Sequence, residues 1–109
     1  MRRIYHLVSL PVWQRCGDGP YQADSLAAEG FIHCSNNEQV VRIANLFFAG
    51  VPEVLALTID ANRLTSPVRV EDSGTGELFP HVYGPIDRAA IIEAIPLQRG
   101  PDGRWQWHS

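Results

Sequence analysis

Apolar residues recur with the spacing of a β-strand in several separate segments of the chain. Residues 4–10 alternate and are rich in strand formers, and the period of two places His6 on the same face as Ile4 and Val8. Residues 53–60 are apolar with little alternation, which predicts a central strand buried on both faces. Further strands are predicted for shorter runs bounded by turn residues, at 31–34, 68–71, 78–83 and 90–95.

Helical signals occupy three of the segments between these strands. Pro11 is acceptable in a first helical turn, where its missing amide would have no partner, so one or two turns are expected over residues 12–16. Asp24 or Ser25 can cap a short helix that ends at Gly30. The longest helix is expected over residues 37–49.

This longest helix has both a start signal and an apolar face. Ser35 and Glu38 have the spacing of a capping box, in which each side chain accepts a hydrogen bond from the other residue's backbone amide. Gly50 ends the helix. Apolar residues then recur at i, i+4, i+7 and i+8, which predicts a stripe facing the core, made of Val40, Ala44, Phe47 and Phe48 with Val41 adjoining.

The C-terminal segment predicts a hairpin turn followed by an edge strand. Residues 104–107 alternate, so Trp105 and Trp107 are expected on one side, exposed and available as a partner surface. About six or seven strands with two or three helices make the fold class α+β. Because typical domains run to roughly 100–150 residues, residues 1–109 are expected to form a single domain.

Composition and charge matter here for what they exclude. The 109 residues are 45% hydrophobic and 19% charged, as in ordinary globular proteins. The net charge is −3, the basic residues are all arginine, and only Arg2 and Arg3 are adjacent, so nucleic-acid binding is not expected. The chain shows neither a signal-peptide pattern nor a run of about 18 apolar residues. We therefore expect no membrane partner and a cytoplasmic location.

Histidine is the residue type whose placement is most informative. His6, His33 and His81 all lie in strand-like apolar segments. One such histidine is usually a hydrogen-bonded core residue, but three in one small sheet point to a shared site. Three imidazoles can hold zinc, yet no His-x-His, His-x-x-x-His or Glu-x-x-His pair occurs. No metal site is therefore predicted.

The two cysteines carry little chemistry in this pattern. Cys34 follows His33 and points to the opposite side of the strand, which argues against a Cys/His nucleophile pair. We expect Cys34 to be a small buried apolar residue. Cys16 and Cys34 are too few to indicate a disulfide framework, and both are expected to be reduced.

Glu71 is the best candidate for a functional carboxylate. It ends a short strand just before residues 72–77, a Gly-rich loop expected to be mobile and to border a site. The alternative is a solvated strand end. Gly74-Thr75-Gly76 is not a phosphate-binding loop, because the following Lys-Ser or Lys-Thr and the opening helix are missing.

Two strings within a wider set of residues resemble a known family, the domain of unknown function 952 family. The strings are Gly-Phe-Ile-His-Cys-Ser and Phe-Pro-His-Val-Tyr-Gly-Pro, and the resemblance covers about residues 3 to 95. The residues that carry it are Ile4-Tyr5-His6, Trp13, Tyr21, Ser25-Leu26, the run from Glu29 to Ser35, Gln39, Ala44-Asn45, Ile59-Asp60, Glu71 and the run from Phe79 to Ile86.

The resemblance implies a fold similar to the ADP-ribosyltransferases, with a split, strongly bent mixed β-sheet and two or three helices. It implies a nicotinamide-dinucleotide cleft between the halves of the sheet and no established activity. In that superfamily a first-strand His or Arg orients the dinucleotide, a second-strand Ser or Tyr lines the nicotinamide pocket, and a late Glu stabilises the reacting ribose. By position, His6 matches the first role, His33 and Ser35 lie near the second, and Glu71 or the 80–83 strand lies near the third.

The leading hypothesis is an ADP-ribosyltransferase-like domain that binds NAD or a related nucleotide or small molecule, or transfers a group from NAD. The His-Tyr-Glu and Arg-Ser-Glu signatures are not present at their usual spacings. A carboxylate such as Glu71 suits stabilisation of a positive ribose. The candidate catalytic residues are Glu71, His6 and His33, and the candidate ligand-binding residues are Ser25, Ser35, His81 and Tyr83.

Several alternatives stay open. One is a non-catalytic small-ligand binding or accessory module. Another is an RNA 2′-phosphotransferase-like enzyme, for which Arg42, Arg69 and Arg88 are available to read phosphate. A metal-dependent enzyme is a further possibility. The purely structural account is that the three histidines form one buried hydrogen-bonded network that fixes the sheet.

Overall fold

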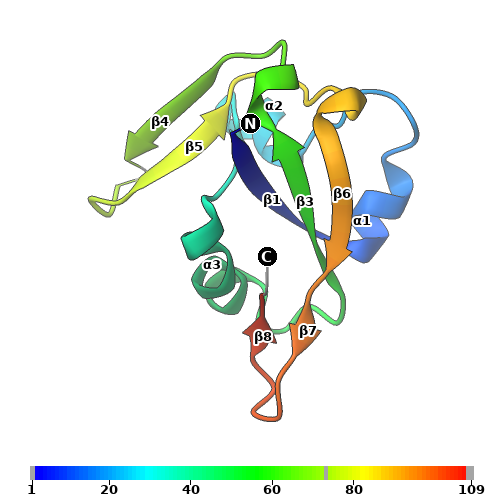
Figure 1. The fold of residues 1–109 in the computed structure, drawn as a ribbon, viewed down its shortest axis with the longest axis vertical. Coiled ribbons are helices and arrows are strands. Elements are labelled where there is room, and N and C mark those ends of the chain that lie inside the picture. The colour runs from blue at the N-terminus through cyan, green and yellow to red at the C-terminus, as the bar shows by residue number, and fades with distance from the viewer. Residues whose placement is uncertain (1, 73, 108–109) are drawn as a thin grey trace.

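The first of two three-stranded sheets is organised around β3 (Val54–Asp60), in a computed structural model that describes residues 2–72 and 74–107. β3 pairs antiparallel with β1 (Arg3–Ser9) on one side and β6 (Ile91–Pro96) on the other (Figure 1). Its alternating side chains enter two separate cores, Leu55 and Leu57 on one face and Val54 and Ala56 on the other. The prediction of a central strand buried on both faces is confirmed.

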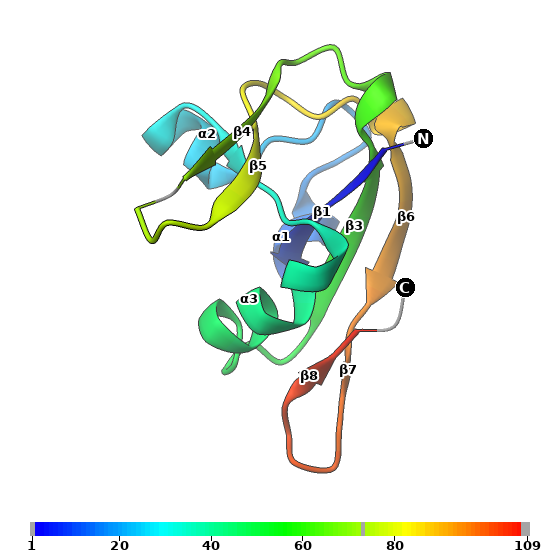
Figure 2. The same ribbon diagram turned by 60° about the vertical axis from the view of Figure 1, so that its left-hand side comes forward.

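A second sheet has β5 (Leu78–Val82) at its centre, between β2 (Ile32–His33) and β4 (Val68–Asp72). The two sheets meet where Tyr5 and Ser35 exchange backbone hydrogen bonds of 2.9 and 2.7 Å. Figure 2 shows the β4–β5 hairpin reaching away from the first sheet. Every strand pairing within the described residues is antiparallel, so the expectation of a mixed sheet is wrong.

Three short α-helices and three 3₁₀ turns connect the strands of the described residues. The α-helices are α1 (Leu10–Arg15), α2 (Asp24–Glu29) and α3 (Val40–Phe47), and the 3₁₀ turns are Asn37–Gln39, Ala61–Arg63 and Arg88–Ala90. α2 ends at Gly30, whose φ of 90° is one that glycine adopts readily. Its N-terminus follows Ala23 without a side-chain cap, so the predicted cap at Asp24 or Ser25 is wrong. In the described part of the chain no helix is long and apolar enough to cross a bilayer.

The longest helical segment begins at Asn37 as predicted, as a 3₁₀ turn, but its capping box lies one residue later than predicted. The backbone amide of Ser35 donates to the carbonyl of Tyr5, so it is not available to Glu38. The amide of Asn36 donates instead to Gln39 Oε1 at 2.9 Å. The capping box therefore joins Asn36 and Gln39, and the prediction of a Ser35–Glu38 box is wrong.

The apolar stripe of α3 is only partly buried. Val40 and Ala44 are fully buried and Phe48 packs against the same core, as predicted. Phe47 is 69% exposed and Val41 is 38% exposed, so their assignment to the core is wrong. α3 ends at Phe47, and the chain turns there so that Phe48 takes the inward position.

The C-terminal hairpin consists of β7 (Gln98–Arg99) and β8 (Trp105–Gln106) and packs against α3. Trp105 is 3% exposed, its indole N–H donates to the carbonyl of Phe48 at 2.8 Å, and the Arg99 guanidinium lies 3.9 Å from its ring centroid. Trp107 packs against the same core, so the two indoles do share a side. Trp105 is a core residue and Trp107 is partly buried against the same core, so the prediction that both indoles are exposed is wrong.

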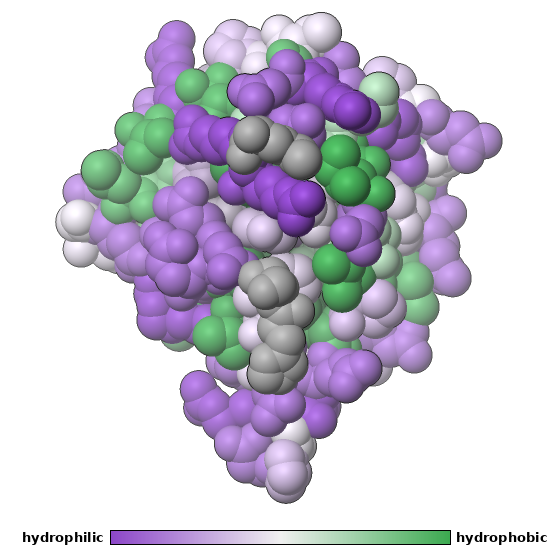
Figure 3. Space-filling view, in the orientation of Figure 1, coloured by the Kyte–Doolittle hydropathy of each residue, from purple (hydrophilic) through white to green (hydrophobic). Residues whose placement is uncertain are grey.

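Hydrophobic residues on the face seen in Figure 3 are scattered among hydrophilic ones and do not form one broad patch. The tip of the C-terminal hairpin, at the bottom of that view, is hydrophilic. Six large apolar side chains are exposed in the described residues, namely Val41, Leu46, Phe47, Val70, Leu78 and Ile92. Two of them, Leu46 and Phe47, border the cleft described next.

Candidate functional site

Three strands from distant parts of the sequence bring His6, His33 and His81 together. β1 carries His6, and the Tyr5–Ser35 pairing places β1 beside the end of β2. β2 pairs with β5 in a register that sets His33 opposite His81, with ring centroids 5.4 Å apart. Nδ1 of His6 lies 2.6 Å from the carbonyl oxygen of His33. The convergence expected from the sequence is therefore present.

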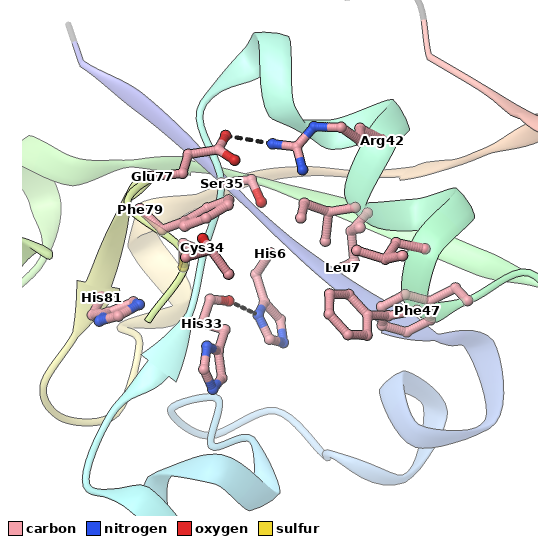
Figure 4. A pocket seen from close by; sticks show the side chains of 14 residues that line it. His6, Leu7, His33, Cys34, Ser35, Arg42, Phe47, Glu77, Phe79 and His81 are labelled. Carbon is pink, nitrogen blue, oxygen red and sulfur yellow. Dashed lines mark hydrogen bonds and ion pairs between the residues drawn. The ribbon is translucent and has the colours of Figure 1, made fainter. Parts of the chain in front are cut away.

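The three histidines line an open cleft of about 630 Å³ between the strands and α3 (Figure 4). In Figure 4, His33 and His81 lie on one side of the cleft and Phe47 lies across it. Its strand side also includes Leu7, Cys34, Ser35 and Phe79, its α3 side Arg42, Ile43, Leu46, Phe47 and Phe48, and its loop side Thr75 and Glu77. The purely structural account requires the three histidines to be enclosed in the core. They instead line an open cleft, which argues against that account.

His6 is a neutral imidazole with both ring nitrogens engaged. A carbonyl oxygen can only accept, so Nδ1 of His6 carries the proton donated to His33. The other nitrogen, Nε2, then accepts from the hydroxyl of Tyr21 at 2.8 Å. Burial lowers the pKa of His6 to about 4 and raises the pKa of Tyr21. His6 therefore fixes the junction of the two sheets and contributes no free nitrogen to the cleft.

The depressed pKa of His6 predicts a loss of stability in mild acid. The unfolded chain takes up its proton near pH 6.5, whereas the folded chain does so only near pH 4. The stability present above pH 6.5 is therefore lost progressively as the pH falls from 6.5 to 4. Between pH 7 and pH 5 this amounts to about 2 kcal/mol.

Urea unfolding of the wild type and His6→Gln at both pH values isolates this contribution. The wild type is expected to lose about 2 kcal/mol more than the variant between pH 7 and pH 5. A second measurement follows the imidazole signals of His6 in the wild type, which should not titrate above pH 5. Titration near pH 6.5 would contradict the assignment.

Glu71 is anchored beside the cleft rather than in it. Glu71 is on β4, where it lies opposite Phe79 of β5, and it is not among the residues that line the cleft. One of its oxygens, Oε1, accepts from the hydroxyl of Tyr83 and from Nδ1 of His81, the latter at 3.0 Å. These two hydrogen bonds, with Tyr83 the larger cause, lower the pKa of Glu71 below its ordinary value. Glu71 reaches the cleft only through His81.

The remaining predicted site residues divide between the cleft and its surroundings. Ser35 lines the cleft and is 5% exposed. Tyr83 does not line it and instead contacts Glu71 and Phe31. Ser25, on α2, is not a lining residue either. Cys34 is 3% exposed and burial raises its thiol pKa, in agreement with the prediction of an inert apolar role.

Glu77 and Phe47 line the cleft but were not predicted as part of a site, and Arg42 was considered only as a phosphate contact in one alternative. Arg42 and Glu77 form an ion pair at the upper edge of the cleft in Figure 4, and Gln39 Nε2 donates to the same Glu77 oxygen at 2.8 Å. The apolar pattern predicts Phe47 in the core, whereas the structure leaves it exposed. The only local signal was the Phe47-Phe48 pair, because adjacent helical positions point about 100° apart and this favours unequal burial of the two rings.

Among the residues that the structure describes, the arginines are dispersed and the acidic residues form no metal cluster. Of the three arginines considered for phosphate recognition, Arg42 lines the cleft, while Arg69 lies over the ring of Tyr83 and Arg88 over that of Trp13. Within residues 2–72 and 74–107, no group of three or more His, Cys, Asp or Glu side chains is arranged to hold a metal ion. The cleft is lined by aromatic and aliphatic side chains, by Cys34, by the hydroxyl residues Ser35 and Thr75, and by one ion pair.

Comparison with known families gives a match over residues 7–94 to the model described as a protein of unknown function, DUF952. The chain belongs to this family. The DUF952 match runs from β1 to β6 and includes His33, Ser35, Glu71 and His81, while His6 lies one residue before it. No curated protein matches this DUF952 chain.

Solved structures of one other protein resemble this DUF952 chain over nearly its whole length. The X-ray structure of protein CC0527 from Caulobacter crescentus has a TM-score of 0.84 and 29% identity, covering 96% of this chain and 94% of that one. The solution NMR structure of the same protein has a TM-score of 0.82 and 30% identity, covering 97% and 93% of the two chains. The fold described above is therefore shared with an experimentally determined structure.

Proposed function

We propose that this DUF952 protein binds a nucleotide, with NAD as the first candidate, in the cleft beside His33 and His81. The observation that carries the proposal is the pairing of an exposed ring, Phe47, with a polar wall across the same cleft. A flat heterocycle can stack on such a ring, while the hydroxyl of Ser35 and the guanidinium of Arg42 are within the lining to meet polar groups.

The size and charge of the cleft support a small ligand of mixed character. Its volume of about 630 Å³ falls in the usual range of roughly 300–1,000 Å³ for small-molecule sites. Arg42 and Glu77 neutralise each other, so the lining has no surplus of positive charge for a longer polyphosphate. The resemblance to ADP-ribosyltransferases adds the expectation that NAD is the nucleotide, on a fold-level analogy.

Two versions of this function make different use of Glu71. In the transferase version, the nicotinamide–ribose bond breaks and a carboxylate stabilises the positive ribose. In the binding-module version, NAD or a related small molecule binds without turnover. The position of Glu71 outside the lining, held by Tyr83 and His81, favours binding without turnover.

Calorimetric titration of the full chain with NAD tests the proposal. We expect saturable binding at one site and competition by AMP or by nicotinamide mononucleotide, whichever half occupies the cleft. A nicotinamide-release assay on wild type and Glu71→Gln then separates the two versions. Release that Glu71→Gln abolishes supports the transferase, and binding without release supports the binding module. Absence of saturable binding by NAD and by both halves would refute the proposed function.

A further inference from the structure

We propose that Nε2 of His81 is the hydrogen-bond acceptor for a hydroxyl of the bound ligand, and that Glu71 is a positioning residue that acts only through His81. The inference rests on the proposed function of the cleft. It goes further by naming the atom that contacts the ligand and the kind of ligand group that this atom takes.

His81 occupies the middle of the second sheet with its side chain on the cleft face. The alternation along β5 puts Phe79 and His81 on one face and Val82 on the other, where Val82 enters the core. The imidazole is 2% exposed and stacks on Phe31, with centroids 4.2 Å apart and planes 19° apart. The ring of His33 meets it edge to face at 5.4 Å. These contacts fix the plane of the His81 ring.

Glu71 fixes which nitrogen of His81 carries the proton. Oε1 of Glu71 already accepts from the hydroxyl of Tyr83 and also lies 3.0 Å from Nδ1 of His81. Both hydrogen bonds favour the ionised carboxylate, which has no proton to donate. Nδ1 must therefore be the donor. In the neutral ring the lone pair is then on Nε2.

This Nε2 is a buried nitrogen with no hydrogen-bond partner in the described residues. Native proteins pair nearly all of their buried polar atoms, so an unpaired nitrogen in a residue that lines a cleft indicates a bound group. The other two histidines differ. His6 uses both nitrogens internally, and the half-exposed His33 donates through Nε2 to Oε2 of the Glu29 carboxylate at 2.9 Å.

The chemistry of a lone pair selects the ligand group. A bare Nε2 accepts an O–H or N–H, whereas a carboxylate or phosphate presents only acceptors and is disfavoured at this point. Among the groups that a nucleotide offers, the ribose hydroxyls are donors of this kind. The geometry therefore orients the ribose toward the second sheet, with the base left for the ring of Phe47.

Long-range ¹H–¹⁵N spectra of the full chain test the inference directly, because they report which nitrogen of each histidine is protonated. We expect His81 in the free protein to be protonated at Nδ1 and bare at Nε2. Addition of NAD or adenosine should shift the Nε2 resonance of His81.

Glu71→Gln should mix the two protonation forms of His81 and weaken binding about tenfold. Tyr83→Phe, which keeps the Glu71–His81 contact, should produce a smaller change.

Glu29→Gln provides the matched control, since it alters the carboxylate partner of the neighbouring His33. It should change the signals of His33 and leave the protonation pattern of His81 as in the wild type.

A proton on Nε2 of His81 in the free protein, or unchanged His81 spectra in Glu71→Gln, would overturn the inference. If NAD binds and Nε2 does not shift, the inference fails while the proposed function stands. If adenosine binds and shifts Nε2 but NAD does not bind, NAD is the wrong nucleotide and the inference stands. If neither binds, both fail.

Discussion

Replacing Trp105 by alanine is expected to lower the free energy of unfolding by about 3–5 kcal/mol, the range for truncating a buried Trp. The indole is 3% exposed in the core shared by β1, β3 and α3. Its removal also leaves the carbonyl of Phe48 without the indole N–H and Arg99 without its stacking ring. Urea denaturation followed by circular dichroism measures the change.

Gln106→Ala is the matched control for this prediction, because Gln106 is the exposed neighbour of Trp105 on β8. Its effect should stay within about 0.5 kcal/mol, as for most surface substitutions. If Trp105 instead served a partner protein, its alanine variant would keep wild-type stability. That result would restore the partner surface suggested by the alternating C-terminal pattern.

Replacing Phe47 by alanine is expected to weaken nucleotide binding about 5- to 140-fold without changing stability. Stacking of a base on an aromatic side chain contributes roughly 1–3 kcal/mol, and each 1.4 kcal/mol is tenfold in affinity. Phe47 is 69% exposed, so its truncation creates no cavity in the core. Calorimetric titration with NAD, beside urea denaturation, gives both quantities on the same samples.

Val41→Ala serves as the control on the same helix. Val41 is also exposed, at 38%, but does not line the cleft. It should bind NAD with wild-type affinity. Equal affinities for Phe47→Ala and the wild type would show that the base does not stack on this ring, and equal losses in both variants would indicate a change in α3 as a whole.

Local sequence signals predicted most of the secondary structure, because they depend on residues close together in the chain. The apolar run of residues 54–60, the glycine that ends α2 and the turn residues of the C-terminal hairpin each correspond to an observed element. One error occurs where a distant residue competes for the same group. Ser35 could not cap a helix because its amide pairs with Tyr5.

The candidate site was predictable in its members but not in their roles. The sequence indicated five candidates, because polar residues are unusual within or beside apolar strand segments. They are His6, His33, His81, Ser35 and Glu71. It could not indicate that His6 has both nitrogens engaged or that Glu71 lies outside the lining. Those facts depend on atoms 10 to 27 residues apart in the chain.

By itself, then, the sequence determined the α+β class, the strand order along the chain and the three histidines on strands. Only the tertiary structure decided that β2 pairs with β5 in the register that sets His33 opposite His81, and that the ring of Phe47 borders a cleft while that of Trp105 is buried. The physical reason is that periodicity assigns a side chain to a face, whereas burial and hydrogen bonding depend on which other element packs against that face.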